Sequence, residues 1–594
     1  MKFVLRLILF PFRLPFYVYY KLSLLFPAGD TLIHRVPDRF TMTRQSGILS
    51  MFVSRWETNY AEYLSLLTII RLSRHLRKIV LFIPEIEASW AETQEIAEHI
   101  RKIADTEKEI EAYSDGGNLK TLYLMSAASK RTTSPHSNFT ITFPSMEPFF
   151  FGELLRKLGV QAEVITAGKF KSAGEMFSRR SFSKPARENM LHLLKGMRKE
   201  ILDTIQKSPG MDSATNSDLV SFLLKNTIVH EQDLRNLGFF HEAMEENDFR
   251  DQVSGKTPGS FSDHIFSRTP AKNQNPEPTA KRPKVRITNE SRLVKRYRRE
   301  RVPLLRLRSL PAAALVSMEG PISMGRTGDE PAAYGISARA FQDLFASLEN
   351  SNEEAVIIYI NSPGGGSDAS ELIYQSIRRL SERKPVLAVM GSVAASGGYY
   401  IACAANRIYG SPLTMTGSIG VVAIRPNLKG LYRKLGISKE RIFFDPTRDI
   451  LSEAAPLSPA SKKLLQKSIE QTYGLFLSRV AQGRQKEVRD VHEFGQGRVW
   501  LGRDLQENGL MDSFGDLTEV ISEYRKAAGY DERQEFQINI YPEIKTDLRT
   551  LLGEKMHGLP GFFAKKEKLA WQLLREGSRG TLAFLLETFL IKGL

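Results

Sequence analysis

Cysteine is almost absent from this chain: Cys403 is the only one among 594 residues. A single thiol excludes a disulfide framework and any zinc site built from several cysteines. The ten histidines are scattered, and none of them forms a His-Glu-x-x-His motif. We therefore expect no metal ion and no cofactor, and we look for chemistry among ordinary side chains.

An uninterrupted membrane-spanning run is also missing. Residues 1–27 are strongly apolar, but Arg13 and Lys21 lie among them, and Pro11 and Pro15 interrupt a helix. No small-x-small cleavage site ends the run, which argues against a removed signal peptide. Two interpretations remain ahead of a buried core helix: an uncleaved membrane anchor, or an amphipathic helix lying in the plane of the membrane.

Acidic residues are too few to balance the basic ones, and the net charge is +16. The excess is concentrated in residues 281–308, which hold twelve Lys or Arg against Glu290 and Glu300. This basic segment is either a solvated, partly helical stretch or a contact for anionic lipid head groups, at about 1 kcal/mol per cation. No nucleic-acid-binding fold surrounds it, so nucleic acid is not an expected partner.

A chain of this length folds as more than one domain. Apolar runs typical of buried strands alternate with amphipathic helical patterns, which indicates an α/β fold. We predict five segments: a membrane anchor or amphipathic segment over 1–30, an α/β repeat over 31–250, a basic linker over 251–308, a second α/β repeat over 309–530, and an amphipathic tail over 531–594.

The two α/β segments repeat each other. Ile79-Val-Leu-Phe-Ile83 matches Val356-Ile-Ile-Tyr-Ile360, and Leu155-Arg-Lys-Leu-Gly-Val160 matches Tyr432-Arg-Lys-Leu-Gly-Ile437, both at an offset of 277. A later match, Asp233 with Asp504, has an offset of 271. The chain therefore holds two copies of one βα fold.

The copies differ where chemistry is expected. At the offset of 277, Ser396 corresponds to Leu119, and the glycines 364–366 correspond to Glu87, Ala88 and Ser89. The first copy has lysines in Ala167-Gly-Lys-Phe-Lys-Ser-Ala-Gly, whereas residues 441–456 of the second copy have none. Each copy keeps what the other has lost, as expected for one site shared between them.

Ser396 lies where an apolar strand, Val386 to Met390, gives way to small residues and then to Tyr400, Ile401 and Ala404 at helical spacing. A serine at a helix N-terminus is either an N-cap or a nucleophile beside unpaired backbone N–H groups. Taken alone, the stretch favours the N-cap.

A nucleophile needs oxyanion donors and a base. The loop Asn361-Ser-Pro-Gly-Gly-Gly follows a buried strand, and glycines let backbone N–H groups approach a ligand closely. No histidine lies near Ser396 in the sequence, so a lysine is the candidate base. Such a lysine must be neutral, which requires its pKa to fall from about 10.4 towards 7 through burial.

Several motifs together resemble signal peptide peptidase A in its long form, a membrane-bound serine peptidase. The resemblance covers about residues 50–530. Its motifs are Asn361-Ser-Pro-Gly-Gly-Gly, Gly391-Ser-Val-Ala-Ala-Ser-Gly-Gly-Tyr-Tyr400, Leu413-Thr-Met-Thr-Gly-Ser-Ile-Gly420, Gly497-Arg-Val-Trp500 and Lys171-Ser-Ala-Gly-Glu-Met-Phe177. It implies two tandem repeats of a Clp protease/crotonase-like βα superhelical fold, preceded by an N-terminal membrane segment.

The resemblance also implies roles for residues. Ser396 corresponds to the nucleophile and Lys171 to the general base, with Lys169 a weaker candidate. Ser418 falls on a serine that orients the lysine, and Gly365 and Gly397 on the oxyanion donors. It further implies apolar peptide substrates such as cleaved signal peptides, membrane lipid as a partner, a tetramer-like ring of subunits, and an inner-membrane location with the catalytic part on the periplasmic side.

This chain departs from the family pattern at Ser367 and the third glycine of the loop, in its long basic insert, and in its broken N-terminal segment. Two other functions stay open from the residues: a crotonase-like acyl-CoA enzyme that uses only the oxyanion loop, and a non-catalytic scaffold that binds peptides or lipid.

Overall fold

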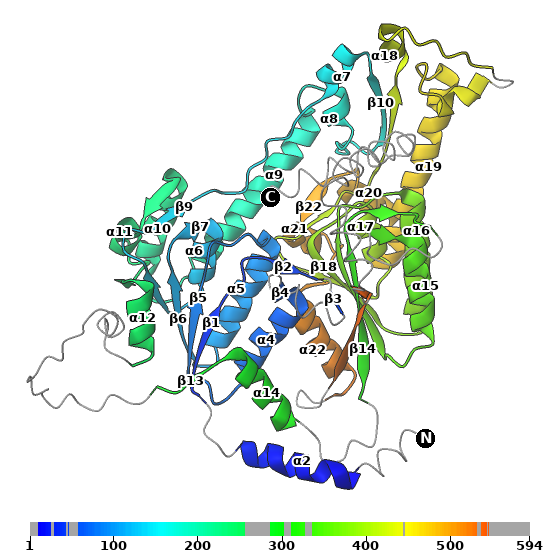
Figure 1. The fold of residues 1–594 in the computed structure, drawn as a ribbon. Coiled ribbons are helices and arrows are strands. Elements are labelled where there is room, and N and C mark those ends of the chain that lie inside the picture. The colour runs from blue at the N-terminus through cyan, green and yellow to red at the C-terminus, as the bar shows by residue number, and fades with distance from the viewer. Residues whose placement is uncertain are drawn as a thin grey trace, which may run out of the picture.

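The fold consists of two α/β halves packed side by side (Figure 1). The structure is a computed structural model. It describes residues 10–24, 29–42, 45–46, 58–255, 285–301, 310–326, 335–442, 446–530, 536–542 and 544–545. The predicted linker up to residue 280 lies mostly outside these ranges, and the predicted amphipathic stretch 569–591 lies wholly outside them.

A parallel sheet forms the centre of the first half. In the described residues it has six strands. Their spatial order is β12 (Glu242–Ala243), β8 (Lys130–Thr133), β6 (Glu109–Ser114), β5 (Lys78–Phe82), β1 (Thr31–Arg35) and β13 (Ile287–Thr288). The last strand comes from the basic segment, where Ile287 pairs with Thr31.

The helices of the first half are α4 (Tyr60–Leu72), α5 (Trp90–Ala104), α6 (Leu119–Met125), α7 (Gly152–Leu158), α8 (Glu175–Ser178), α9 (Lys184–Ile205), α10 (Ser213–Lys225), α11 (Glu231–Asn236) and α12 (Glu246–Val253). Helix α5 begins with a capping box between Ser89 and Glu92. The strands β7 (Gly117–Asn118), β9 (Asn138–Thr140) and β11 (Ile228–His230) form a small separate sheet.

A second sheet forms the centre of the other half. Its path among the described residues is β22 (Val499–Leu501), β20 (Met415–Gly417), β18 (Val386–Ala395), β17 (Ala355–Ser362), β14 (Ala312–Glu319) and β24 (Gln537–Tyr541). β19 (Arg407–Gly410) joins β18 and also pairs with β23 (Ser513–Phe514). β24 comes from the predicted C-terminal tail.

The helices of this half are α15 (Ala338–Glu349), α16 (Ser367–Ser381), α17 (Gly397–Ala402), α18 (Lys429–Lys434), α19 (Pro459–Arg484), α20 (Val488–Phe494), α21 (Gly502–Glu507) and α22 (Leu517–Ala527), with a 3₁₀ turn η1 (Pro446–Leu451). The remaining strands are β21 (Val421–Asn427), which pairs with β10 (Gln161–Ala167) of the first half, and short pairs: β15 (Ile322–Ser323) with β16 (Ile336–Ser337), β2 (Phe40–Thr41) with β4 (Thr58–Asn59), and β3 (Gln45–Ser46) with β25 (Ile544–Lys545).

The duplication read from the sequence recurs in the element bounds. Shifted by 277, β8 and β9 coincide with β19 and β20, and α6 lands on α17. Shifted by 271, β11 and β12 coincide with β22 and β23. The strand orders β12-β8-β6-β5-β1 and β23-β19-β18-β17-β14 correspond as well. One ancestral unit therefore accounts for both halves.

The molecule is built in layers, and successive side chains of each strand point alternately to the layer on one side and on the other (Figure 1). Ile357 and Tyr359 of β17 face the first half, whereas Ile358 and Ile360 face α15 and α16. In the first sheet, Val80 faces α12. The order is therefore α12, first sheet, α4 and α5 together with α22, second sheet, then α15 and α16.

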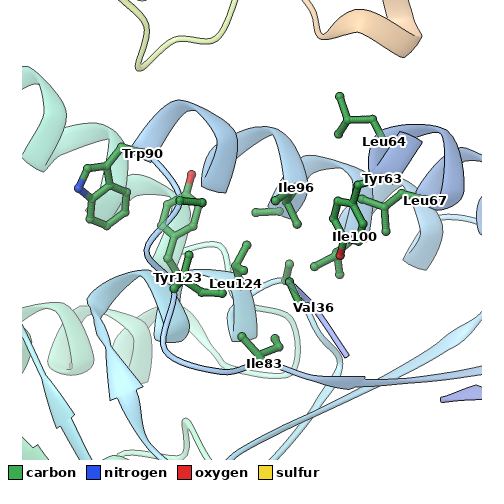
Figure 2. Close-up of a cluster of buried hydrophobic side chains, with 14 of the residues drawn as sticks. Val36, Tyr63, Leu64, Leu67, Ile83, Trp90, Ile96, Ile100, Tyr123 and Leu124 are labelled. Carbon is green, nitrogen blue, oxygen red and sulfur yellow. The ribbon is translucent and has the colours of Figure 1, made fainter. Parts of the chain in front are cut away.

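The middle layer is the main contact between the halves. Figure 2 shows part of its core, where Tyr63 and Leu67 of α4 lie beside Ile100 of α5. Both helices also pack on the second half, so one apolar cluster spans both copies. Burying apolar surface at roughly 25 cal/mol per Å² makes this shared cluster the main stabiliser of the arrangement.

A buried polar pair lies in the same layer. His99 Nε2 of α5 is 2.8 Å from Asp516 Oδ2, at the N-cap of α22, and both side chains are 3% exposed. Asp516 also accepts hydrogen bonds from the amides of Thr518 and Glu519. Although burial alone would raise it, His99 and these hydrogen bonds lower the pKa of Asp516 to about 2.

The apolar N-terminal run contains helix α2 (Phe10–Ser23), with Pro15 inside it. Among the described residues, no helix combines the length and apolar character that crossing a membrane requires. The basic segment contains a helix, α14 (Glu290–Arg301), which lies beside α2 and α4.

We predict that Asp516→Asn lowers the free energy of unfolding by about 1–3 kcal/mol, because it removes the charge that satisfies buried His99 while keeping a capping side chain. Since the folded pKa is depressed, the contribution of this carboxylate is present above about pH 4 and is lost as the pH falls towards 2. Urea unfolding at several pH values measures both effects.

The control is Asp218→Asn on α10, an exposed aspartate that should change stability by less than about 0.5 kcal/mol. Equal stability of Asp516→Asn and the wild type at neutral pH would show that the pair contributes nothing.

Candidate active site

Ser396 lies at the turn between β18 and α17, as the sequence predicts. Its backbone has φ 55° and ψ −117°, a conformation that costs a non-glycine residue about 1–3 kcal/mol. Its N–H donates to Gly417 O at 2.8 Å, and its carbonyl accepts from Tyr400 N at 2.9 Å. The Ser396 hydroxyl makes no capping hydrogen bond, so the N-cap interpretation is wrong.

Helix α17 is shorter than the spacing of its apolar residues predicts. It ends at Ala402, and Ala404 lies beyond its C-cap, Cys403. The thiol of Cys403 is fully buried and donates to Tyr400 O. Burial raises the pKa of this thiol to about 12, so it stays protonated and is no competing nucleophile.

The glycine loop after β17 touches the Ser396 turn. A Cβ on Gly364, whose φ is +102°, would lie 2.7 Å from Gly397 N and 2.8 Å from Ser396 Cβ. A Cβ on Gly397 would lie 3.1 Å from Gly365 N. The amides of Gly364 and Gly366 donate to Ser362 Oγ and Ile322 O. The loop therefore places Gly365 next to Gly397, and only glycine allows this approach.

Lys171 comes from the first half and meets Ser396. Its Nζ is 3.0 Å from Ser396 Oγ, 2.9 Å from Ser418 Oγ and 3.2 Å from Ser418 O. The Lys171 side chain is buried, with 8% of its surface exposed. The three residues that the resemblance singles out thus lie together within one chain.

Strand pairing carries Lys171 across the boundary between the halves. β10 runs antiparallel to β21, from Gln161 opposite Asn427 to Ala167 opposite Val421. Glu163 of β10 forms an ion pair with Arg425 of β21 and accepts from Leu457 N at 2.9 Å. Lys171 follows the end of β10, and Ser418 precedes the start of β21.

The loop Gly495-Gln-Gly-Arg498 packs against the backbone of Phe170 and Lys171. Phe170 N donates to Gln496 O at 2.8 Å, and a Cβ on Gly497 would lie 2.6 Å from Lys171 Cβ. The Arg498 guanidinium lies 4.2 Å from the centroid of the Phe170 ring. Its carbonyl accepts from Ser418 N at 2.7 Å, so one loop positions both Lys171 and Ser418.

Lys169, the weaker candidate base, is in a different environment. Its side chain is exposed, and its Nζ lies 5.3 Å from the centroid of the Phe170 ring. Lys171 is therefore the buried lysine of the pair, and Lys169 is the exposed one.

Two supporting residues had no signature in the sequence. Asn189 of α9 donates to Val499 O at 2.8 Å and accepts from Val499 N at 2.9 Å, which ties the first half to β22. The Tyr473 hydroxyl accepts from Gln496 N at 3.0 Å. Both contacts join residues far apart in the chain.

Within the described part of the chain, no group of three or more His, Cys, Asp or Glu residues is arranged to hold a metal ion.

Comparison with known proteins shows the family to which the chain belongs. The profile of peptidase family S49 matches residues 102–219 and 378–531, one segment in each half, and the Clp protease profile matches residues 328–414. A putative protease of Synechocystis is 34% identical over 235 residues, which cover 39% of this chain and 84% of that protein. The chain belongs to peptidase family S49.

Longer relatives agree with this assignment. The chloroplastic serine protease SPPA of Arabidopsis thaliana is 30% identical over 446 residues, covering 75% of this chain and 62% of that protein. Protease 4 of Haemophilus influenzae is 28% identical over 479 residues, covering 80% of this chain and 73% of that protein. The S49 chain is thus a serine peptidase similar to the long form of signal peptide peptidase A.

We predict that Gly497→Ala in this S49 peptidase lowers turnover about 100-fold, because the new methyl group displaces the Lys171 backbone. Gly529→Ala is the matched control, since Gly529 has nearly the same φ, +77° against +78°, and no atom within 4 Å of an added Cβ. Both variants should lose about 1 kcal/mol of stability from the backbone conformation. Equal turnover in the two variants would show that Gly497 does not position the lysine.

Proposed function

We propose that this protein is a serine endopeptidase with a Ser396–Lys171 dyad that cleaves apolar peptides through an acyl-enzyme. The supporting observation is the 3.0 Å distance between buried Lys171 Nζ and Ser396 Oγ, across the two halves of one chain. A neutral amine within hydrogen-bond distance of a serine hydroxyl is the arrangement that general-base activation requires.

The three oxygen neighbours of Lys171 support proton transfer from Ser396 to the lysine. A neutral lysine amine carries two N–H bonds and one lone pair. The carbonyl oxygen of Ser418 can only accept, and the Ser418 hydroxyl accepts the second N–H. With the amine neutral, as we propose, its lone pair faces Ser396 Oγ at 3.0 Å and accepts the Ser396 O–H.

The reaction uses these groups twice. Ser396 Oγ attacks the peptide carbonyl carbon while its proton moves to Lys171 Nζ. The N–H groups of Gly365 and Gly397 stabilise the oxyanion of the tetrahedral intermediate. The Lys171 ammonium then protonates the leaving amine, and the C–N bond breaks. Water then attacks the acyl carbon while Lys171 takes one of its protons. The ester bond to Ser396 Oγ breaks, the lysine ammonium returns the proton to Oγ, and the acid product leaves.

The proposed substrates are cleaved signal peptides and other apolar peptides, because a relative from Enterococcus faecium, 31% identical over 190 residues, is named a putative signal peptide peptidase. We propose also that the protein acts at the inner membrane, with its catalytic part on the periplasmic side, and that it assembles into a ring of subunits. The division of the chain into five segments also stays a prediction.

A crotonase-like acyl-CoA reaction would need only the glycine loop. It gives no reason for a lysine of the first half to be buried against Ser396 and Ser418. The dyad accounts for both contacts, so the peptidase is the better explanation.

We predict that Ser396→Ala and Lys171→Met each lower hydrolysis of an apolar fluorogenic peptide at least about 10³-fold in detergent solution, because either change removes half of the dyad. Wild-type kcat/KM should rise with pH along one deprotonation whose midpoint lies well below 10.4, the ordinary lysine value. Fluorescence assays of peptide hydrolysis at a series of pH values measure the activity of the variants and the pH dependence of the wild type.

The matched controls are Lys169→Met, two residues from the proposed base, and Ser392→Ala, whose hydroxyl donates to Ser89 Oγ rather than facing Lys171. Both should keep near wild-type turnover. Full activity in folded Lys171→Met would refute the dyad, and loss of activity in Lys169→Met alone would transfer the role of base to Lys169.

We predict that Ser418→Ala lowers kcat about 10- to 100-fold and leaves KM nearly unchanged, because the amine loses one of the two acceptors that orient it. The carbonyl acceptor remains, which makes the loss smaller than that in Lys171→Met. An increase in KM with unchanged kcat would assign Ser418 to substrate binding.

A further inference from the structure

A basic hollow lies far from the active site. It has a volume of about 410 Å³ and is bounded by the end of α2, by β13 and by α14. Of the described residues that line it, five are cationic, none is acidic, and His75 is also present. The five are Arg286, Arg292, Lys295, Arg296 and Arg299. A hollow lined in this way favours an anion.

The helix that carries most of these cations is firmly held. Leu293 of α14 is 1% exposed and belongs to the core of the first half. Glu290, at the start of α14, lies 2.6 Å from Nδ1 of buried His34 on β1. β13 also pairs with β1, so both elements are attached to the first sheet, and Arg292 and Lys295 on the other side of α14 are exposed. The hollow is therefore part of the fold.

The end of α2 closes the hollow. Arg299 Nη1 donates to Ser23 Oγ at 3.1 Å, and Arg296 Nη2 donates to Leu24 O at 3.3 Å. Glu300, outside the lining, pairs with Arg296 at 3.2 Å and neutralises part of its charge. Burial and Arg296 lower the pKa of His75, as expected in a positive environment.

The opposite wall depends on a close backbone approach. A Cβ on Gly29 would lie 2.5 Å from Arg286 O and 2.7 Å from Thr288 N. Only glycine allows the chain after α2 to pass this near to β13. The approach places Arg286 among the residues that line the hollow.

The helix whose end closes the hollow, α2, carries exposed apolar side chains. Leu14, Val18 and Leu22 of α2 are 41%, 46% and 54% exposed, and their spacing of four residues places them on one face of the helix. Tyr19 on the same helix is 60% exposed. A helix with an exposed apolar row next to cations is typical of a protein that rests on an anionic bilayer.

We propose that the hollow binds the phosphate of an anionic phospholipid head group while the row Leu14, Val18 and Leu22 rests in the bilayer. Arginine suits this ligand because its planar guanidinium donates two parallel hydrogen bonds to phosphate oxygens. Figure 1 places α2 and α14 at the opposite end of the molecule from β10 and α18. The site is thus independent of the proposed dyad.

The test is flotation of the full-length protein with vesicles of phosphatidylcholine alone, or of phosphatidylcholine and phosphatidylglycerol in equal parts. Wild type should bind the second kind and not the first, and binding should fall as salt rises. Arg292→Gln combined with Lys295→Gln should weaken binding on the order of 25-fold, about fivefold for each charge. Both residues are exposed, so the fold should persist.

The matched control, Lys195→Gln with Arg198→Gln, removes two exposed cations from α9 and should bind like the wild type. An equal loss in both double variants would reveal diffuse charge attraction and overturn the site. Equal binding of wild type to both vesicles would assign attachment to the apolar row alone.

Inorganic phosphate tests the other source of this chemistry. In one outcome, millimolar phosphate raises the melting temperature of the wild type but not of the Arg292/Lys295 variant, while neither protein floats with vesicles. That pair of results would make free phosphate the ligand and the lipid assignment wrong. Peptide hydrolysis in detergent should be equal in wild type and in both double variants. Failure of the lipid test with normal hydrolysis would leave the proposed peptidase function untouched.

Discussion

The antiparallel pairing of β10 with β21 is the interaction on which the site depends. One strand belongs to each half, and the pairing ends with Ala167 opposite Val421. Just beyond that point the chain of the first half delivers Lys171, and just before it the second half delivers Ser418. A slip of one residue in this register would turn every side chain of β10 to the other face and withdraw the lysine from Ser396.

The rest of the fold holds that register. The Glu163–Arg425 ion pair lies on the paired strands themselves. The double hydrogen bond of Asn189 with Val499 fixes α9, which follows the lysine, to the sheet that carries Ser418. At the other end of the interface, the shared apolar cluster and the His99–Asp516 pair keep the two sheets stacked. Distant contacts thus determine a separation of a few ångströms at the site.

The sequence predicts a good part of this arrangement because the two copies can be compared with each other. The offset of 277 locates the strand–turn–helix unit twice, and the exchange of Leu119 for Ser396 shows which copy carries the hydroxyl. The paired losses lead to the segment that holds Lys169 and Lys171 without any contact information. The family motifs then separate Lys171 from Lys169, a distinction that composition and periodicity do not make.

Other features depend on contacts between residues far apart in sequence. Ser396 has the residue type and position of an N-cap, and its positive φ, imposed by the glycine loop and by Gly417, turns the hydroxyl to Lys171 instead. Asn189 and Tyr473 are ordinary helix residues until their partners are known. Likewise, the basic run reads as a solvated stretch, whereas buried Leu293 and the Glu290–His34 contact fix it to the first half.

Fusing the two copies into one chain has a consequence for concentration. The lysine and the serine are tethered through a folded body, so their effective concentration at each other is set by geometry and not by the amount of protein present. Two separate subunits that shared such a site would lose it on dilution, as their complex dissociated. In this chain both residues belong to one folded molecule, so no contact between subunits is needed to bring them together.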